Sequence, residues 1–456
     1  MPGLFGILEL GKRTLISQQF AQNIVGNNIA NVNTEGYSRQ RTQFKQFGNI
    51  NTPWGRMGLG VQVEKVIRSR DALIDRLYRE GQGTLKEWEM RAQFLQQIDT
   101  AFSEVDESGL GAQLDAFFSA WYDLANDPEN AQPRIALKER ALALTDTFHR
   151  IVRKLKDQKQ NINTRIEKNV KAVNSLVKKI AAINAKIPAS TTSTGVSNDL
   201  LDERDRLIDE LAGLVDVQVI ERSDGRVGVY IGSINMVEGA YFQTLSLKYE
   251  SDGSTTIARV LLPTNETFSP TRGELKALLD LRDDLIPSYE KSLDTLAQNL
   301  VEQINAYHKV GYNPDGETNL NFFDNRYITA ETIRLDETIL NNPEKIAAAA
   351  VDEIGDNTQA LRIAALKDAG LIGGVSFREY YAALITRVGL DGQEANDFLK
   401  NQEIFVNQTA LQREQVTGVS LDEEMVDMIK YQQTYLAAAR MITTADSMIE
   451  AIINLK

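Results

Sequence analysis

The sequence predicts an elongated, mainly α-helical, multi-domain protein with a small β domain inserted in its middle. Three observations predict this fold class. Both ends carry amphipathic helical patterns, residues 134–187 repeat apolar side chains every seven positions, and period-two alternation is confined to residues 215–268. A chain of 456 residues is too long for one hydrophobic core, so we expect two to four domains.

The first element is a helix over residues 4–30. Its apolar residues recur at spacings near three, four and seven, and they are Leu4, Leu8, Leu15, Ile16, Phe20, Ile24 and Ile29. An asparagine-rich stretch over residues 27–33, followed by Gly36, ends the helix. We expect a turn-rich segment through Pro53, Trp54 and Gly55, and then a short extended piece over residues 58–63.

Helical patterns return over residues 71–102 and 110–126, and the longest helix is expected over residues 134–187. Pro128 and Pro133 bracket the connection before this helix, and Pro188 stops it. Its seven-residue repeat consists of Phe148, Leu155 and Ile162, then, after a shift of four, Ile166, Val173, Ile180 and Ile187. Such a repeat favours helix-on-helix packing, and 54 residues at ~1.5 Å each make a rod of about 80 Å.

The β region follows a flexible link over residues 190–196 and a helix over residues 199–214 that Asn198 caps. Alternating valines on either side of a turn at residues 224–225 predict a hairpin. A second alternation, at Leu245, Leu247 and Tyr249 with a turn at residues 251–253, repeats the pattern.

After the β region, a helix is expected over residues 273–310 with a break or kink at Pro287. Residues 313–316 form a turn and residues 319–325 are irregular. Residues 344–456 contain no proline, and helical patterns dominate there.

The C-terminal helix, residues 421–455, has the most regular pattern in the sequence. Its seam positions are Leu421, Met428, Tyr435, Ile442 and Ile449, with Tyr431, Ala438, Ala445 and Ile452 at the alternate positions. Ser420 and Glu423 have capping-box spacing, which fixes the start of the helix. The seam lacks charge after its first turn, so the helix needs a partner. That partner is either another subunit or the core of the same subunit.

Composition excludes several classes of protein. The net charge of −13 argues against nucleic-acid binding, although residues 1–70 carry nine Lys/Arg against three Asp/Glu, which leaves +6 there and −19 elsewhere. The simplest interpretation of this unevenness is two solvated surfaces. The absence of cysteine fits a cytosolic protein or one exported unfolded. No apolar run approaches the ~20 residues of a membrane span, so we expect no membrane insertion.

Catalytic and metal-binding patterns are absent from the sequence. Its two histidines, His149 and His308, belong to no HExxH pattern, and neither a GxSxG nor a GxxxxGK[ST] sequence occurs. Carboxylate pairs such as residues 202 and 205, or 283 and 284, are expected by chance among 63 acidic residues. We therefore expect no enzyme activity, no cofactor and no metal site.

Several separate stretches resemble the flagellar hook-associated protein 1 family. The first covers residues 28–40, and its motif residues are Asn31, Thr34, Gly36, Tyr37, Ser38, Arg39 and Gln40. Rod, hook and junction proteins share the beginning of this motif, whereas its Tyr-Ser-Arg-Gln continuation is similar to the junction protein. Further similar stretches are residues 58–61, 67–71, 199–205, 273–283, 418–424 and 431–440.

The resemblance implies a structural subunit of a ring that joins hook to filament. It implies an inner coiled-coil domain (residues 1–40 plus 415–456), an elongated helical domain (41–214 plus 269–414) and an outer β domain (215–268). Implied partners are other copies of the chain, the hook protein, hook-associated protein 3 and an export chaperone at the C-terminal region. Unfolded export through the flagellar type III channel places the protein outside the cell. The single β region suggests a lean member without extra outer domains.

For the mechanism, we expect both terminal helices to be loosely held in an isolated subunit and to become ordered when subunits stack. The residues expected to drive assembly are Leu8, Leu15, Phe20, Ile24, Leu421, Met428, Tyr431, Tyr435, Ile442, Ile449 and Ile452. The alternatives are another axial protein such as the hook protein, a secreted coiled-coil effector or adhesin, and an enzyme with a metalloprotease insert. The missing HExxH argues against the last of these.

Overall fold

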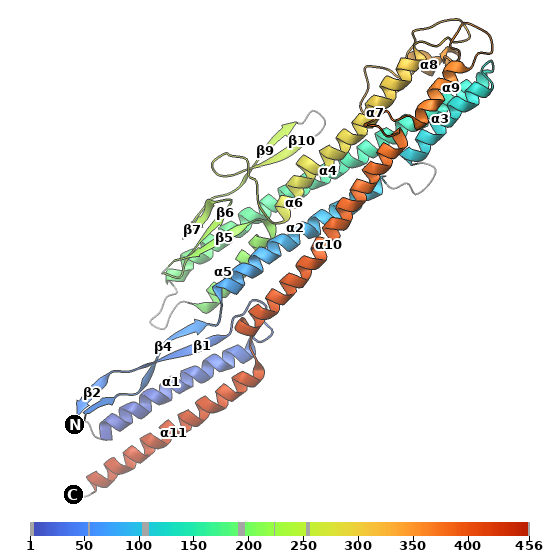
Figure 1. The fold of residues 1–456 in the computed structure, drawn as a ribbon. Helices are drawn as coiled ribbons and strands as arrows, with labels where there is room; N and C mark the ends of the chain where they lie inside the picture. Colours follow the sequence, from blue (N-terminus) through green and yellow to red (C-terminus); the bar gives the residue numbers. More distant parts are fainter. Residues whose placement is uncertain are drawn as a thin grey trace.

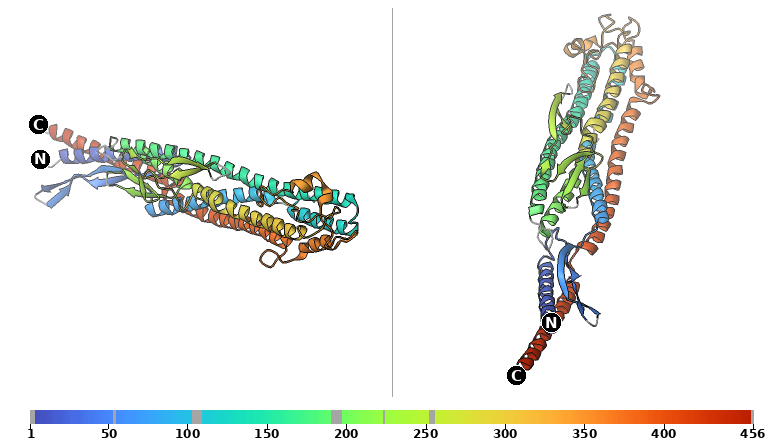
Figure 2. Two further views of the ribbon diagram at one scale, coloured as in Figure 1. Left: turned by 90° about the horizontal axis from the view of Figure 1, so that it is seen from above. Right: turned by 90° about the vertical axis from the view of Figure 1, so that its left-hand side faces the viewer.

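The protein is a long rod with both termini at one end (Figure 1). A computed structural model describes residues 4–52, 55–102, 109–189, 197–222, 224–251 and 256–454. Helices run along most of the rod, and the strands lie in small sheets (Figure 2). The predicted fold class, mainly helical and elongated with a small β region, is confirmed.

Long helices build the rod. They are α1 (Leu4–Ala30), α2 (Ala72–Phe102), α3 (Leu110–Asn126), α4 (Ala131–Ala189), α5 (Asn198–Leu214), α7 (Ile286–His308), α10 (Phe377–Thr417) and α11 (Leu421–Ile453). Short helical elements are α6 (Glu274–Asp280), α8 (Glu337–Asn341), α9 (Thr358–Ala364), π segment η1 (Leu281–Leu285) and 3₁₀ segments η2 (Pro343–Lys345) and η3 (Ala365–Asp368). The predicted bounds of α1 and α3 agree with these.

The longest helix differs from its prediction at both ends. α4 begins at Ala131, so Pro133 lies inside its first turn and does not close a connection. A proline is tolerated there because the N–H groups of the first turn have no partner within the helix. The helix also continues one residue past Pro188. At ~1.5 Å per residue, its 59 residues span about 88 Å.

Helix α5 differs from its prediction at its cap. Its N-cap is Ser197, not Asn198, and no side chain caps it. The predicted flexible link over residues 190–196 lies outside the described residues.

A long β arm, residues 40–68, leaves the body beside α1 (Figure 1). Its strands β1 (Gln40–Gln46) and β4 (Val61–Arg68) are antiparallel, and β2 (Asn49–Thr52) pairs with β3 (Gly55–Gly58) at the tip. The extended piece predicted over residues 58–63 overlaps β3 and β4, whereas β1 and β2 were not predicted. Pro53 and Trp54 of the predicted turn lie outside the described residues. The arm is rich in glutamine, asparagine and cations, so the apolar alternation that identifies a half-buried strand is absent.

The central strands pack on α4. A four-stranded sheet has the order β5 (Val217–Glu221), β6 (Val227–Ile231), β7 (Ile234–Glu238) and β8 (Tyr241–Phe242), and β9 (Ser246–Ser251) pairs with β10 (Thr256–Leu261). The predicted hairpin is confirmed as β5–β6, with Gly225 at φ 82° in its turn. The second hairpin is present too, although residues 252–255 of its turn lie outside the described residues.

Three asparagines of α4 hold the strands through side-chain amides. Asn163, Asn174 and Asn184 donate to the carbonyls of Thr256, Leu245 and Val227 at 3.0, 2.8 and 2.9 Å. The strands therefore share the hydrophobic core of the helices.

Near Pro287, where a break or kink was predicted, the helical run changes to a π segment and is not broken. The chain passes from α6 through the π segment η1 into α7, with Pro287 near the start of α7. Proline lacks an N–H, and its ring clashes with the carbonyl four residues earlier. The wider π turn just before Pro287 accommodates it without ending the helix.

The hydrophobic core lies in the body and is nearly absent from the terminal end. In the body it includes Trp121, Phe148, Tyr289 and Phe322, each with no exposed surface or almost none. Among the described residues of α1 and α11, the apolar side chains that are buried are Ala21, Val25, Ala438 and Ala445. The terminal helices thus lack a core of their own.

Candidate functional site: the terminal helix pair and its joint

Helices α1 and α11 lie side by side at the terminal end (Figure 1). The least exposed positions of α11 repeat at spacings of four and three, and they are Glu424, Met428, Tyr431, Tyr435, Ala438, Ile442, Ala445 and Ile449. On α1 the buried positions are Gly11, Ser17, Gln18, Ala21, Val25 and Asn28. Both series are typical of a two-helix coiled coil.

The two helices approach closely at a glycine. A Cβ added at Gly11 would lie 2.7 Å from Ile442 Cγ1 and 3.4 Å from the carbonyl oxygen of Ala438. The partner that reaches the small seam residues of α11 is therefore the N-terminal helix of the same chain. The two terminal helices thus cover part of each other's apolar stripe within one chain, and the rest of each stripe is left for a partner.

The predicted assembly residues fall into two groups. Leu8, Leu15, Phe20 and Ile24 of α1 are half-buried, as are Met428, Tyr431, Tyr435, Ile442 and Ile449 of α11. Leu421 and Ile452 are 48% and 58% exposed, and Ile16, part of the predicted stripe, is 55% exposed.

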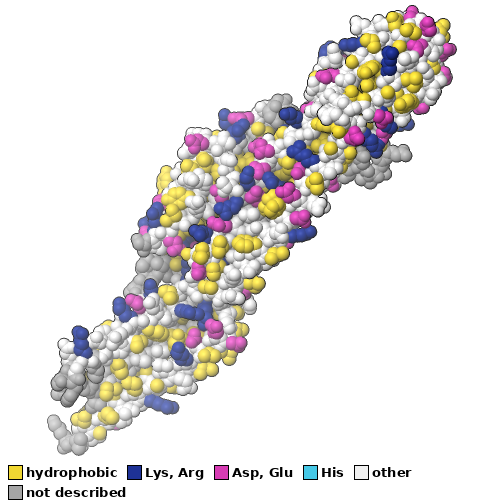
Figure 3. Space-filling view, in the orientation of Figure 1, with side chains coloured by type: hydrophobic (Ala, Val, Ile, Leu, Met, Phe, Trp, Pro, Cys, Tyr) yellow, Lys and Arg dark blue, Asp and Glu magenta, His cyan; other side chains and the backbone are white. Residues whose placement is uncertain are grey.

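Apolar side chains of the helix pair outside the seam are uncovered, and on α11 they lie on both flanks of the seam. These exposed side chains are Phe5, Ile7, Ile16, Leu421, Met425, Val426, Ile429, Leu436, Met441, Met448, Ile452 and Ile453. A shallow groove of about 360 Å³ runs between the two helices, bordered by Ile7, Met441 and Met448. Figure 3 shows apolar side chains gathered over this end of the rod. We call these residues the outer face.

The motif that follows α1 is organised around Asn28. Its side chain donates to the Gln40 carbonyl and to Glu424 Oε2, both at 2.9 Å, and accepts from the Gln40 N–H at 3.0 Å and the Tyr37 hydroxyl at 2.8 Å. Burial, with the nearby carboxylate of Asp202, raises the pKa of Tyr37 and keeps its hydroxyl a donor. One buried amide thereby ties α1, β1 and α11 together.

The rest of the motif forms a compact turn. Thr34 Oγ1 donates to Asn31 Oδ1 at 3.1 Å, and Gly36 has φ 79°, a backbone conformation that a side chain would strain. These residues return the chain from the end of α1 to the first strand of the β arm.

Arg39 connects this turn to the start of α11. It is 6% exposed and pairs with Glu423, with Glu424 at 2.6 Å and with Asp427 at 3.6 Å. Burial opposes its charge, but the hydrogen bonds that Arg39 donates to Glu423 and Glu424, with the negative charge of these carboxylates, outweigh that effect and raise the pKa of Arg39.

The predicted capping box at Ser420 is only half formed. Ser420 Oγ accepts from the Glu423 N–H at 3.5 Å, whereas the Glu423 carboxylate turns to Arg39. A complete capping box occurs at Ser376 and Glu379, where α10 begins.

A buried carboxylate pair on α5 holds the base of the β arm. Asp202 accepts from the Ser38 N–H at 3.0 Å and from Ser38 Oγ at 2.7 Å. Arg68 contacts Asp202 at 2.7 Å and Asp205 at 2.9 Å, and Arg70 contacts Asp205 at 3.0 Å. The acidic pair therefore has a structural role at the arm, which its spacing in the sequence did not predict.

Further arginines complete the cluster on the body side. Arg413 of α10 contacts Asp75 at 2.8 Å and Asp209 at 2.7 Å. Burial by itself would raise the pKa of Asp205, but the guanidinium groups around it, from Arg204, Arg70, Arg68 and Arg79, lower its pKa to about 2. The cluster thus stays ionised at neutral pH.

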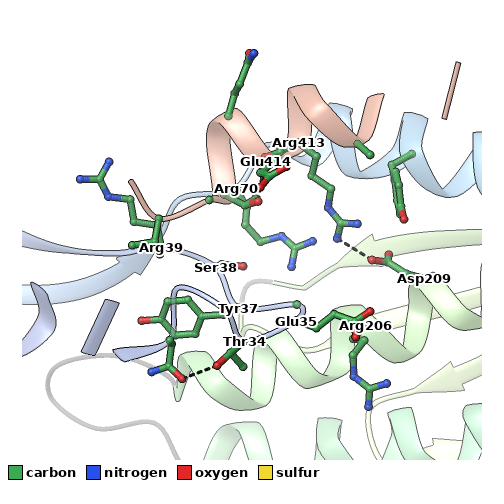
Figure 4. A pocket seen from close by; sticks show the side chains of 18 of the residues that line it. Thr34, Glu35, Tyr37, Ser38, Arg39, Arg70, Arg206, Asp209, Arg413 and Glu414 are labelled. Carbon is green, nitrogen blue, oxygen red and sulfur yellow. Dashed lines mark hydrogen bonds and ion pairs between the residues drawn. The ribbon is translucent and has the colours of Figure 1, made fainter. Parts of the chain in front are cut away.

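We call this cluster the joint, and its residues are Ser38, Arg39, Arg68, Arg70, Asp75, Asp202, Asp205, Asp209, Arg413, Glu423 and Glu424. A cleft of about 880 Å³ lies at the joint, and motif residues line one side of it (Figure 4). A backbone hydrogen bond also connects the motif to the end of α10, because the Arg39 N–H donates to the Thr417 carbonyl at 2.8 Å. Terminal end and body therefore meet through charges and hydrogen bonds.

Part of the joint was visible in the sequence. Ser38 and Arg39 belong to the motif, while Arg68 and Asp202 lie in the other stretches that carry the resemblance. Asp75, Asp209 and Arg413 were missed, since only the tertiary fold brings Arg413 to the two carboxylates.

No chemistry beyond packing is visible at the histidines. His308 Nδ1 lies 2.8 Å from the Leu320 carbonyl oxygen and its Nε2 accepts from the Ala347 N–H at 3.0 Å, deep in the body. In the described part of the chain, no group of three or more His, Asp or Glu side chains is placed to hold a metal ion. Nor does a helix there have both the length and the apolar character to cross a membrane.

Three family models match the chain. The flagellar hook-associated protein FlgK helical domain matches residues 95–323, the flagellar basal body rod FlgEFG protein C-terminal matches residues 412–455, and the flagella basal body rod protein matches residues 8–37. The two rod-protein matches fall on the terminal helices, and the helical-domain match falls on the body.

Relatives align over the whole chain. The flagellar hook-associated protein 1 of Bacillus subtilis is 29% identical, over 100% of this chain and 99% of the relative. The flagellar hook-associated protein 1 of Salmonella typhimurium is 26% identical, over 97% of this chain and 98% of the relative. The latter alignment spans 543 positions, 87 more than the 456 residues here, so that relative carries segments that this chain lacks.

A solved structure shares the fold. The flagellar hook junction protein FlgK from Burkholderia pseudomallei matches with a TM-score of 0.66 and 13% identity, over 75% of this chain and 100% of that one. The rod with paired terminal helices and the matching rod-protein models define an axial structural protein of the bacterial flagellum. Within that class, the chain belongs to the flagellar hook-associated protein FlgK family. It is a structural protein of the hook–filament junction.

Proposed function

We propose that the chain builds the junction by polymerising through the outer face of α1 and α11, while the joint holds the body at a fixed angle to the polymer. The observation that supports this proposal is the set of exposed apolar side chains on both flanks of α11, a helix whose seam is already covered by α1. Exposed apolar surface of this extent on a paired helix marks an interface.

Magnitudes support this role for the outer face. Burying one Met, Leu or Ile side chain stabilises a complex by roughly 1.5–3 kcal/mol. Association costs on the order of 4–15 kcal/mol in lost freedom and side-chain ordering. Five buried outer-face residues per contact therefore offset that cost, and repetition around a ring adds to the stability.

The joint fixes the orientation of the terminal end relative to the body more than it stabilises the fold. Buried ion pairs pay a desolvation penalty comparable to their mutual attraction, so they add little net stability. Their geometry is specific, however, because a guanidinium binds carboxylates in fixed directions. A cluster in which Asp205 pairs with four arginines resists rotation of the terminal end against the body.

Residues 1–40 with 415–456 act in this proposal as the assembly unit, and residues 41–214 with 269–414 as the helical body that carries strands 215–268. The partners are other copies of the chain, the hook protein on one side and hook-associated protein 3 on the other. The absence of cysteine supports unfolded type III export to the cell exterior, and the exposed apolar face of α11 suits an export chaperone. No enzymatic step is proposed, since the sequence carries no catalytic motif.

The test is Ile429→Asp, which places a charge on the outer face without touching the seam. We expect a folded monomer by circular dichroism, loss of the chain from the hook–filament junction by immunogold labelling, and non-motile cells. Ile354→Asp is the matched control, because Ile354 is 94% exposed at the far end of the rod. Normal incorporation of the Ile429 variant would contradict the proposal.

A further inference from the structure

Only some of the Lys and Arg side chains in residues 1–70 form ion pairs within the chain. The cations paired at the joint are Arg39, Arg68 and Arg70, while Lys45 pairs with Glu64 along the β arm at 3.2 Å. Arg41, Arg56 and Lys65 make no ion pair with the described residues. The β arm thus projects from the body with unmatched positive charge.

These cations share a face with an apolar side chain. The strand register sets Arg41 opposite Ile67 and Gln43 opposite Lys65, so the four side chains lie on one side of the hairpin, and all four are exposed. Phe44 points the other way, with its ring 6.3 Å from that of Tyr431 on α11. We call the exposed side the basic face of the arm.

Helix α10 carries an uncovered stripe of complementary character. Its positions repeat at four and three residues as in a coiled-coil seam, and they are Leu390, Glu394, Asp397, Asn401, Ile404, Gln408 and Leu411. Leu390, Ile404 and Leu411 are 59%, 66% and 61% exposed. Glu394 and Asp397 make no ion pair with the described residues. We call these residues the α10 stripe.

The opposite side of α10 is already occupied. Phe398 stacks on Trp88 of α2 with ring centroids 4.6 Å apart, and Val406 is buried beside Gly81. The stripe is therefore a second apolar surface of the helix, and the fold of one chain gives it no partner among the described residues.

The basic face and the α10 stripe cannot meet within one chain. The arm runs from the joint toward the termini, whereas α10 runs from the joint into the body, so the two surfaces diverge (Figures 1 and 2). The charged parts of both surfaces are short. The basic face, residues 41–43 against 65–67, covers about 7 Å along the strands, and residues 390–397 of α10 cover about 11 Å.

We infer that the β arm of one copy lies along the α10 stripe of a neighbouring copy. Arg41 and Lys65 face Glu394 and Asp397, and Ile67, opposite Arg41 in the strand register, rests on Leu390, one turn before Glu394. The contact joins two different surfaces, so it is heterologous and closes when copies are arranged in a ring. It rests on the proposed function, because copies meet only in the assembled junction.

Cysteine cross-linking tests the contact without background, since the chain has no cysteine. Cells without a chromosomal copy would express Lys65→Cys and Asp397→Cys chains together, and their isolated flagella would be oxidised. We expect a band at twice the chain mass. The pair Lys65→Cys with Glu221→Cys, at an exposed site on β5, is the matched control and should stay monomeric.

Localisation in the same flagella separates the two proposals. Absence of the unmodified chain from the junction contradicts the proposed function. Its presence there without a Lys65–Asp397 cross-link, or with a cross-link only to a different protein, overturns the arm contact alone.

Charge reversal gives an independent readout. Arg41→Glu with Lys65→Glu should reduce the number of labelled junctions at least tenfold, while the secreted variant stays folded by circular dichroism. Adding Glu394→Lys and Asp397→Lys to the same chain should restore them. Failure of the fourfold variant to recover would overturn the pairing of these charges.

Discussion

Buried polar side chains decide how the terminal end is attached to the body. Ser38 and Arg68 both depend on Asp202, which lies almost fully inside the joint. A buried charge that loses its partner is costly, so the cluster acts as a unit in which each member requires the others. The carboxylates and guanidinium groups of the joint thus hold the terminal end on the body.

Asp202→Ala tests whether the terminal end is attached to the body through this carboxylate. It leaves the Ser38 N–H and Arg68 without their acceptor, which should destabilise the attachment of the terminal end by roughly 3–5 kcal/mol. Hydrogen exchange should accelerate in the β arm and α1, while amides of α4 keep their protection. Asp199→Ala, at an exposed position of the same helix, should change neither. Equal exchange in both variants would contradict a role for Asp202.

His308 makes the far end of the body sensitive to acid. Complete burial lowers its pKa to about 4, from an ordinary value of 6.5. The neutral ring accepts the Ala347 N–H, and a proton on Nε2 would remove that acceptor. Because the unfolded chain takes up the proton first, stability should fall as pH drops from 6.5 to 4, by about 3 kcal/mol in total.

Trp121 reports this acid transition, as its ring lies 6.3 Å from His308. Urea unfolding followed by tryptophan fluorescence should show a lower midpoint at pH 5 than at pH 7. His308→Gln should flatten that difference, whereas His149→Gln should preserve it. A pH dependence that survives in the His308 variant would assign the effect to another group.

At the scale of elements, the α1–α11 contact depends on small residues. Gly11→Ala and Gly26→Ala bring the same gain in helix propensity, up to about 1 kcal/mol. Gly26 has open space around its Cα, whereas the new Cβ at Gly11 would collide with Ile442.

We therefore expect Gly26→Ala to slow hydrogen exchange in α1 and Gly11→Ala to speed it in both α1 and α11, with an overpacking cost of roughly 1–3 kcal/mol. Identical behaviour of the two variants would show that the helices do not approach closely at Gly11.

The β arm and the α10 stripe show how one element can carry two faces. The inner side of the arm packs on the terminal helices, through Phe44 and Tyr431, and its outer side stays free. Helix α10 likewise covers α2 on one side and leaves Leu390 and Ile404 exposed on the other. An element that packs on its own chain on one side and is exposed on the other suits a subunit that binds neighbouring copies.

The whole molecule divides into a well-packed body and a thin terminal end. The body has one continuous core, while α1 and α11 bury mainly Ala21, Val25, Ala438 and Ala445. Urea should therefore unfold the terminal helices before the body, in two separate steps. Hydrogen exchange at increasing urea measures this, and a single cooperative loss of protection along the whole rod would contradict it. Early unfolding would also agree with the expectation of loosely held ends.

The sequence alone determined the helices, the hairpins of the β region and the family. Heptad repeats, alternating valines and the motif around Tyr37 and Ser38 are local signals, because each depends on residues near one another in the chain. It failed at the β arm, whose polar strands take their conformation from packing against α1.

Only the tertiary structure decided which surfaces pack together and which charges pair. It showed that the seam of α11 is met by α1 of the same chain, which leaves a different face for assembly. It also brought Arg413 to Asp75 of α2 and to Asp209 of α5, from positions far apart in the sequence. Periodicity identifies an apolar face but not the surface that covers it, and a charge shows its partner only when the chain is folded.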